Sequence, residues 1–395
     1  MIYLDNNATT AVAPEAYAAM QPFVTDVFFN PSSAYEAARG PARALAVARE
    51  QVAAFLGGAA LEEVLFTGSA TESNNTAIFG AIRANRTRRH LVTTAVEHPS
   101  VLEVCKEAER EGCEVSIIGV KRNGELDLDA FVRALRKDTL LVSVMHANNE
   151  TGVVFPVGEL ARIVKETDPS ILFHTDATQS AGKLGLDVQD ALAGVDLLAF
   201  SGHKLHGPKG VGVLYVRRGT RVRPFLCGGH QENGRRAGTE NTGHIAALAV
   251  ACDLAASALP AENRVRALRD HLQAALCRDI PWVEVNGEGT ERLPNTLNLA
   301  CHCIEGESIL YQLDAHGICA SSGSACTSGS LEPSHVLKAM QVPFMAMHGS
   351  VRFSLSRYTT AEDVEAVIRV FPGIVENLRR ISPYWDVARK APRRV

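Results

Sequence analysis

Short apolar runs alternate with longer amphipathic stretches through the first half of the chain. The amphipathic stretches have helical spacing and cover residues 34–56, 71–85, 100–111, 129–136 and 156–167. The apolar runs, which we expect to be strands, are Val64–Phe66, Leu91–Thr94, Val115–Ile118, Leu140–Val144, Ile171–Phe173, Leu197–Phe200 and Gly212–Val216. Apolar strands separated by helices indicate a mainly parallel sheet that helices cover on both faces. The pattern therefore predicts an α/β fold.

The second half of the chain has a different pattern. From about Ile245 to Leu276 it is rich in alanine and helical in pattern, and the charged stretch Glu262–Asp270 within it predicts a long connecting helix. Shorter strand candidates at 296–299 and 351–354 precede a final helix over 361–380. We therefore expect a large domain over 15–255 that binds the ligand. Residues 1–14 and 256–395 should form a smaller α+β domain.

Composition and charge exclude several classes of protein. Apolar residues make up 46% of the 395 and charged residues 21%, which argues against disorder, collagen or a coiled coil. The net charge of −4 gives no basic field, so we expect no nucleic-acid partner. The longest apolar run, Ile245–Cys252, is too short for a membrane span, and no signal peptide is visible. Nine irregularly spaced cysteines then indicate reduced thiols and a cytoplasmic protein.

Three chemically distinctive groups follow predicted strands, where ligands bind in open parallel sheets. Ser69-Ala70-Thr71 begins a helix, and its free N–H groups offer either an anion site or an ordinary N-cap. Asp176 is either a buried carboxylate in need of a positive partner or the cap of a turn. Lys204 is either a Schiff-base lysine or a solvated turn lysine.

Taken together, these groups match the needs of one cofactor. Pyridoxal phosphate requires a phosphate cradle, a partner for its pyridinium nitrogen and an amine. Ser201 and His203, beside Lys204, could bind the phosphate. A metal site at His203 and His206 is the alternative, but no third ligand is nearby in the sequence. The glycine motifs of dinucleotide-binding proteins and nucleotide hydrolases are missing from the sequence.

Two further residue types suggest chemistry. His98 follows the strand at 91–94, where it could stack on a cofactor ring and move protons, or it could be an ordinary core histidine. Cys326 lies among small polar residues in 321–330, which predicts an exposed, reactive thiol. Cys301-His302-Cys303 is similar to part of a metal site, but on a strand His302 would point away from the two thiols.

Seven motifs spread from residue 3 to about residue 385 resemble those of the cysteine desulfurases. They are Tyr3–Thr10, Glu97–Pro99, Asn148–Gly152, His174–Ala177, Ser201–Lys204, Arg236–Asn241 and Ser324–Gly329. The resemblance implies a pyridoxal-phosphate enzyme with the aspartate-aminotransferase fold, known as fold-type I, whose small domain carries the cysteine loop. Gly228–Glu232, Leu331–His335 and Ser382–Trp385 look like the nitrogen-fixation type. A housekeeping or tRNA-thiolation desulfurase and a selenocysteine lyase are alternatives, and an aminotransferase would not need the thiol.

The resemblance also implies the roles of individual residues. Lys204 forms the Schiff base, His98 stacks on the ring and moves protons, and Cys326 takes the sulfur. Asn149 and Arg352 bind the substrate. Thr239 reaches the cofactor phosphate of a neighbouring subunit, which implies a homodimer. The full set implied for cofactor binding is Ala70, Thr71, His98, Asn149, Asp176, Gln179, Ser201, His203, Lys204 and Thr239.

The implied reaction converts L-cysteine to L-alanine and leaves a persulfide on Cys326. The sulfur would pass to an iron–sulfur scaffold protein, and the same thiol is a candidate ligand of an iron–sulfur cluster during transfer. The rival from another class is a cofactor-free scaffold that ligates iron through cysteines. Its ligands would be Cys301, Cys303, Cys319 and Cys326.

Overall fold

The larger sheet of the molecule confirms the predicted α/β class. The computed structural model describes residues 1–322 and 333–393. Seven strands lie in the order β2-β8-β7-β6-β5-β3-β4, and only β8 runs against the others. They are β2 (Val64–Thr67), β3 (His90–Thr94), β4 (Glu114–Ile118), β5 (Thr139–Ser143), β6 (Leu172–Asp176), β7 (Leu197–Ser201) and β8 (Gly212–Val216). Each strand overlaps one of the predicted apolar runs.

Both faces of this sheet are buried, which explains why its strands are apolar throughout. Leu141 and Leu197 belong to the core under one layer of helices, and their neighbours Val142 and Leu198 belong to the core on the other face. The first layer contains α4 (Ala70–Ala84) and α5 (Pro99–Arg110). The second contains α3 (Arg39–Phe55), α6 (Leu128–Ala134), α7 (Val157–Thr167) and α8 (Thr242–Ala258), and α1 (Pro14–Met20) and α2 (Pro22–Thr25) pack on α8.

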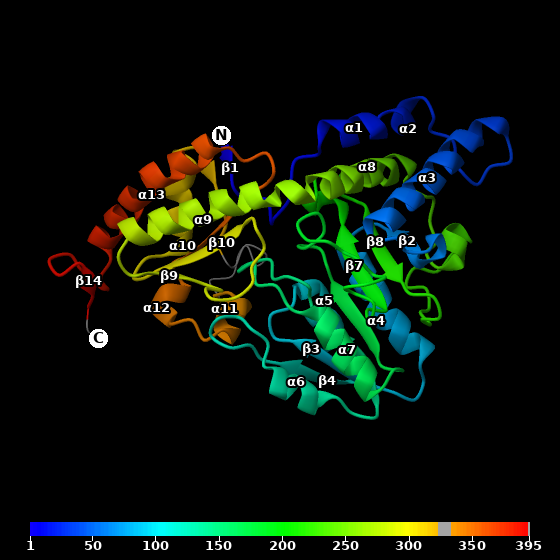
Figure 1. Ribbon diagram of the computed structural model, residues 1–395, viewed down its shortest axis with the longest axis horizontal. Coiled ribbons are helices and arrows are strands. Elements are labelled where there is room, and N and C mark those ends of the chain that lie inside the picture. The colour runs from blue at the N-terminus through cyan, green and yellow to red at the C-terminus, as the bar shows by residue number, and fades with distance from the viewer. Residues whose placement is uncertain (323–332, 394–395) are drawn as a thin grey trace.

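A second group of elements surrounds a core of its own (Figure 1). The antiparallel strands β9 (Val283–Val285), β10 (Thr296–Cys301) and β12 (Ser350–Ser354) form its sheet. The helices α9 (Glu262–Asp279), α10 (Gly306–Ala315) and α13 (Ala361–Ile381) pack on it. The N-terminal strand β1 (Ile2–Tyr3) pairs with β11 (Ile318–Cys319). The remaining elements are α11 (His335–Ala339), α12 (Phe344–Met347), β13 (Trp385–Asp386), β14 (Ala391–Pro392) and short 3-10 turns.

The charged stretch Glu262–Asp270 is helical as predicted, but the helical pattern over 245–276 does not form one continuous helix. Two helices replace it, α8 and α9, with a 3-10 turn over Leu259–Ala261 between them. Pro260 lies in that turn, and proline has no N–H for a helical hydrogen bond. Within the described chain, no single helix has the length and apolarity to cross a membrane, and only the bent pair of α8 and α9 meets both criteria jointly.

Candidate active site

A cavity of about 390 Å³ lies where the predicted residues converge, at the carboxyl ends of the parallel strands. The N-terminal segment and β12 of the small domain complete its wall. Its lining residues are Asn7, Ala8, Ser69, Ala70, Thr71, His98, Ser100, Met145, Ala147, Asn149, Asp176, Thr178, Gln179, Ser201, His203, Lys204 and Arg352. Thr239 is exposed and does not line it, and Cys326 lies outside the described residues.

Asp176 is the last residue of β6, and neighbouring donors fix its carboxylate. Asn74 Nδ2 donates to Oδ2 over 2.7 Å, and the backbone N–H of Thr178 donates to Oδ1 over 2.9 Å. The residue is only 5% exposed. A buried carboxylate is costly without a positive partner, so this geometry suits a cationic ligand atom.

His98 is joined to Asp176 through two polar side chains. Asn74, which donates to Asp176, also donates to Ser100 Oγ (2.9 Å), and that oxygen lies 2.8 Å from His98 Nδ1. The backbone N–H of Ser100 donates to the same Nδ1, so the neutral ring carries its hydrogen on Nε2. Burial lowers the pKa of His98, and the charge of Lys204 lowers it further against the opposing effect of Asp176. His98 is therefore a neutral imidazole at neutral pH.

Lys204 follows β7 in a 3-10 turn and reaches across to the N-terminal segment. Its Nζ donates to the backbone oxygens of Asn7 and Ala8, over 2.6 Å each. Asn7 is itself tied to the small domain through Thr296 Oγ1, to which its Nδ2 donates over 2.8 Å. The ammonium is thus held at the edge of the cavity by a segment that joins the two cores.

The start of α4 lies at the cavity wall and has the N-cap that is one of its two predicted roles. Ser69 is the N-cap, and its side chain accepts from the N–H of Glu72 (3.1 Å). Gly212 of β8 lies against this turn, and a Cβ there would come within 3.0 Å of Ala70 N. Burial and the nearby lysines lower the pKa of His203 to about 4, so it enters the cavity wall uncharged. The start of α4 therefore offers backbone N–H groups to a ligand, and His203 adds no positive charge.

Arg352 of β12 is almost fully buried, at 3% exposure. Its Nη2 pairs with Asp5 Oδ1 (2.7 Å) and its Nη1 donates to the backbone oxygen of Asn149 (2.9 Å). These two contacts fix the guanidinium at the cavity. The ion pair with Asp5 is therefore inside the molecule rather than on its surface.

Polar atoms of the cavity wall still lack partners. Thr178 Oγ1, Gln179 Oε1 and Arg352 Nε are buried, and no hydrogen bond reaches them from the described residues. Buried polar groups are normally satisfied. A polar ligand with a ring hydroxyl, a phosphate and a carboxylate would supply such partners, so the cavity fits pyridoxal phosphate with an amino acid.

Several site residues are not apparent from the sequence as parts of this cavity. Asn7 and Ala8 belong to a quoted motif but have no assigned role there, and Asn74 and Thr178 carry no signal beyond their neighbours. Asp5 pairs with a residue 347 positions away. The one sequence signal for these residues is that they lie next to motifs that follow predicted strands.

The alternative metal sites gain no support in the described parts of the chain. No three His, Cys, Asp or Glu side chains there lie close enough to hold a metal together. His203 and His206 instead contact Thr9 Oγ1 and the backbone oxygen of Ala11. β10 ends at Cys301, so the strand-alternation argument for His302 fails. Its ring pairs with Glu284 (2.7 Å).

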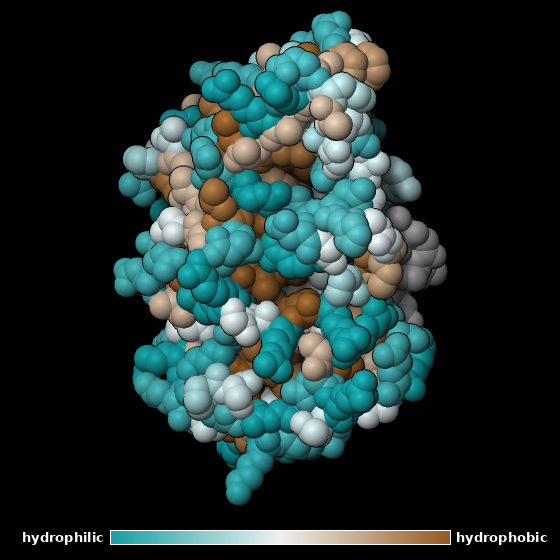
Figure 2. Space-filling view, turned by 90° about the vertical axis from the view of Figure 1, so that its right-hand side faces the viewer, coloured by the Kyte–Doolittle hydropathy of each residue, from teal (hydrophilic) through white to brown (hydrophobic). Residues whose placement is uncertain are grey.

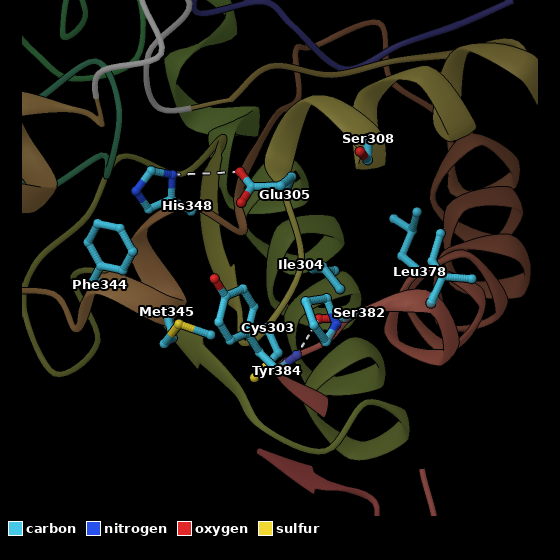
Figure 3. Close-up of a pocket in the computed structure, with 12 residues that line it drawn as sticks. Cys303, Ile304, Glu305, Ser308, Phe344, Met345, His348, Leu378, Ser382 and Tyr384 are labelled. Atoms are coloured by element: carbon cyan, nitrogen blue, oxygen red, sulfur yellow. Dashed lines mark hydrogen bonds and ion pairs between the residues drawn. The ribbon is translucent and has the colours of Figure 1, made fainter. Parts of the chain in front are cut away.

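A second cavity, of about 340 Å³, lies in the small domain and contains none of the residues predicted to bind cofactor or substrate. Figure 3 shows Cys303 within it, with His348 and Glu305 joined at its edge. Cys303 has a left-handed φ of 69° and is almost fully buried. Burial raises the pKa of its thiol, so this cysteine is a poor nucleophile.

Comparison with known proteins agrees with this geometry. The family model of the class-V aminotransferases matches residues 2–367. A cysteine desulfurase of Trichormus azollae is 52% identical over 388 residues, which cover 97% of this chain and 95% of that protein. The cysteine desulfurase NifS of Azotobacter vinelandii is 52% identical over 386 residues, with 98% and 95% covered. The solved structure of a NifS-like protein has a TM-score of 0.89 at 34% identity and covers 95% of this chain and 100% of its own. The fold, the cavity and these similarities agree, and the chain belongs to the cysteine desulfurases of the class-V aminotransferase family.

Proposed function

We propose that this protein converts L-cysteine to L-alanine and transfers the sulfur, as a persulfide on Cys326, to an iron–sulfur scaffold protein in the cytoplasm. The observation that carries the proposal is the single cavity lined by Lys204, Asp176, His98 and Arg352. The similarity to NifS supports a role in nitrogen fixation. The predicted family is confirmed, and its members are pyridoxal-phosphate enzymes.

The cofactor supplies an electron sink for the carbon skeleton of the substrate when it is bound. We assign its holding groups to the chain as predicted: Ala70, Thr71, Ser201 and His203 for the phosphate, Asp176 for the ring nitrogen, Gln179 for the ring hydroxyl, Asn149 for orienting the ring, and Lys204 for the covalent link. Because the neutral His98 carries hydrogen on Nε2, it can donate one proton at that atom and later regain it. The ammonium of Lys204 is a second proton source at the same wall.

The sulfur transfer needs no outside oxidant. The Cys326 thiolate attacks the sulfur of the substrate, an S–S bond forms and the substrate C–S bond breaks. The two sulfur atoms are oxidised to the persulfide level and the substrate carbon is reduced to the methyl group of alanine. Arg352 would hold the carboxylate of the substrate, since its Nε has no partner among the described residues.

A homodimer is part of the proposal. Thr239 is exposed and outside the cavity of its own chain, so it is available to a second subunit. Large apolar side chains are exposed at the end of the molecule that carries α1–α3, among them Tyr17, Val24, Phe28 and Tyr35. Figure 2 views this end and shows hydrophobic patches between hydrophilic side chains. Such surface is typical of protein–protein contacts.

The test is the variant Cys326→Ala. It should keep the visible absorbance of the bound cofactor, and added L-cysteine should still change that absorbance. Alanine and sulfide formation should fall to background, because the sulfur has no acceptor. In the wild type, peptide mass spectrometry after brief exposure to cysteine should find one extra sulfur on the peptide that contains Cys326. A fully active variant, or extra sulfur only on Cys301, Cys303 or Cys319, would refute the proposal.

A further inference from the structure

Described residues on both sides of 323–332 contact residues that line the catalytic cavity or are next to ones that do. Before them, Ser321 exchanges two backbone hydrogen bonds with Arg352 (3.1 and 2.6 Å). After them, His335 Nε2 donates to the backbone oxygen of Glu97 (2.9 Å), next to His98. Cys326 lies between these attachments in the sequence.

The hydroxyl of Ser334, just before His335, uses its one hydrogen and both of its acceptor sites in hydrogen bonds. Its Oγ accepts from the backbone N–H groups of Val336 and Leu337 (3.1 and 3.2 Å) and so caps α11. The same Oγ lies 2.5 Å from Glu150 Oε2. A hydroxyl has one hydrogen and two acceptor sites. Because the helix uses the acceptor sites, the hydrogen is directed to Glu150.

Glu150 is itself rigidly held beside the substrate-binding residues. Its backbone N–H donates to Asn148 Oδ1 (2.9 Å), and its backbone oxygen accepts from Asn298 Nδ2 (3.1 Å). Burial raises the pKa of its carboxyl to about 7, against the opposing effects of Ser334 and Arg352. The side chain does not line the cavity. Glu150 thus cannot touch the substrate, but its neighbour Asn149 does line the site.

We propose that Glu150 and Ser334 are a positioning pair for sulfur transfer: the carboxyl of Glu150, next to the cavity-lining Asn149, holds the hydroxyl of Ser334, which follows Cys326 by eight residues in the sequence. The proposal rests on the proposed function, in which Cys326 accepts the sulfur. Its alternative is that Ser334 serves only as a helix cap. The positioning role requires the hydrogen that Ser334 donates to Glu150, whereas the capping role does not.

The variant Ser334→Asp separates these roles. Aspartate caps helices as well as serine does, but when ionised it has no hydrogen to donate. Loading is measured at about pH 9, well above the pKa of about 7 of the Glu150 carboxyl, so that Glu150 has no hydrogen to donate either. We expect the rate of sulfur loading onto Cys326, measured by rapid quenching and peptide mass spectrometry, to fall about tenfold or more. Cofactor absorbance and the KM for L-cysteine should stay unchanged, because the cavity lining is intact.

The double variant Ser334→Asp with Glu150→Gln should restore the contact in reverse, because the glutamine amide donates to the aspartate. Its loading rate should return to within about threefold of the wild type. Thr360→Ala is the matched control. It removes the N-cap of α13, away from the cavity, and should lower the thermal midpoint without changing the loading rate.

Wild-type loading in Ser334→Asp would overturn the proposal, and so would a double variant no faster than the single one. If Ser334→Asp does not fold, Glu150→Ala, which leaves the cap intact, takes its place with the same expected loss, and normal loading there would overturn the proposal equally. Absence of sulfur from Cys326 in the wild type would instead refute the proposed function itself. The two failures are therefore distinguishable.

Discussion

Replacing Arg352 with lysine should weaken substrate binding by an amount that the contacts of the guanidinium predict. Arginine has five N–H donors and lysine has three. Arg352 spends one donor on Asp5 and one on Asn149, which leaves three for a ligand. A lysine that kept both contacts would have one left. It would therefore lose the two-bond grip on the carboxylate of L-cysteine.

One hydrogen bond to a charged group contributes about 1.5–3 kcal/mol, and about 1.4 kcal/mol corresponds to a factor of ten. At 3% exposure, Arg352 is little screened by solvent, so the full range applies. The KM for L-cysteine in Arg352→Lys should rise about 10- to 100-fold. Steady-state alanine formation measures this KM, and titration of the cofactor absorbance with cysteine measures binding directly.

Arg379→Lys is the control for general loss of a buried arginine. Arg379 is 2% exposed and donates to the backbone oxygens of Pro281, Trp282 and His302, away from the catalytic cavity. Both variants should lower the thermal midpoint, but only Arg352→Lys should raise KM. A KM within threefold of the wild type in Arg352→Lys would show that Arg352 does not bind the carboxylate and that its role ends with Asp5 and Asn149.

Further expectations follow from other residues. Lys204→Ala should abolish turnover, while mass spectrometry of the intact protein still detects bound cofactor after mild desalting; turnover above one tenth of wild type would contradict its role. Asp176→Asn should lower kcat at least about 100-fold with the cofactor retained, and a near-normal kcat would make Asp176 merely a turn cap. Burial lowers the pKa of His146 in the folded protein to about 4. As the pH falls, this histidine therefore takes up a proton in the unfolded chain before it does so in the folded chain, which favours unfolding. Its contribution to stability, present above pH 6.5, should be lost as the pH falls toward 4. Urea titrations should show a shallower decline in His146→Gln, and an identical slope would mean that His146 is not the group responsible.

The sequence predicts the sheet and most of the cavity because both depend on local patterns. The strands are apolar since both their faces are buried, and ligand groups follow them because parallel strands end at one edge. The rest depends on pairs that are distant in the chain. Nothing in the local pattern near Asp5 indicates Arg352, and nothing near Glu150 indicates Ser334. The break at Pro260 is detectable, but the helical pattern on both sides of it favours one helix.

The N-terminal segment makes the completion of the catalytic cavity a late event in the life of the chain. Asn7 lines the cavity, and its neighbour Asn6 donates to the backbone oxygen of Ser354 over 2.8 Å across 348 positions. At the usual pace of about 5–20 residues per second, the ribosome makes that partner about 20 to 70 s after Asn6. Through this interval the large sheet can already form and residues 7, 8 and 10 can bind Lys204 and His203, whereas Asn6 still lacks its partner. A growing chain therefore lacks a complete cavity until β12, which carries Arg352 and Ser354, emerges, although Lys204 and its carbonyl partners at residues 7 and 8 are made much earlier.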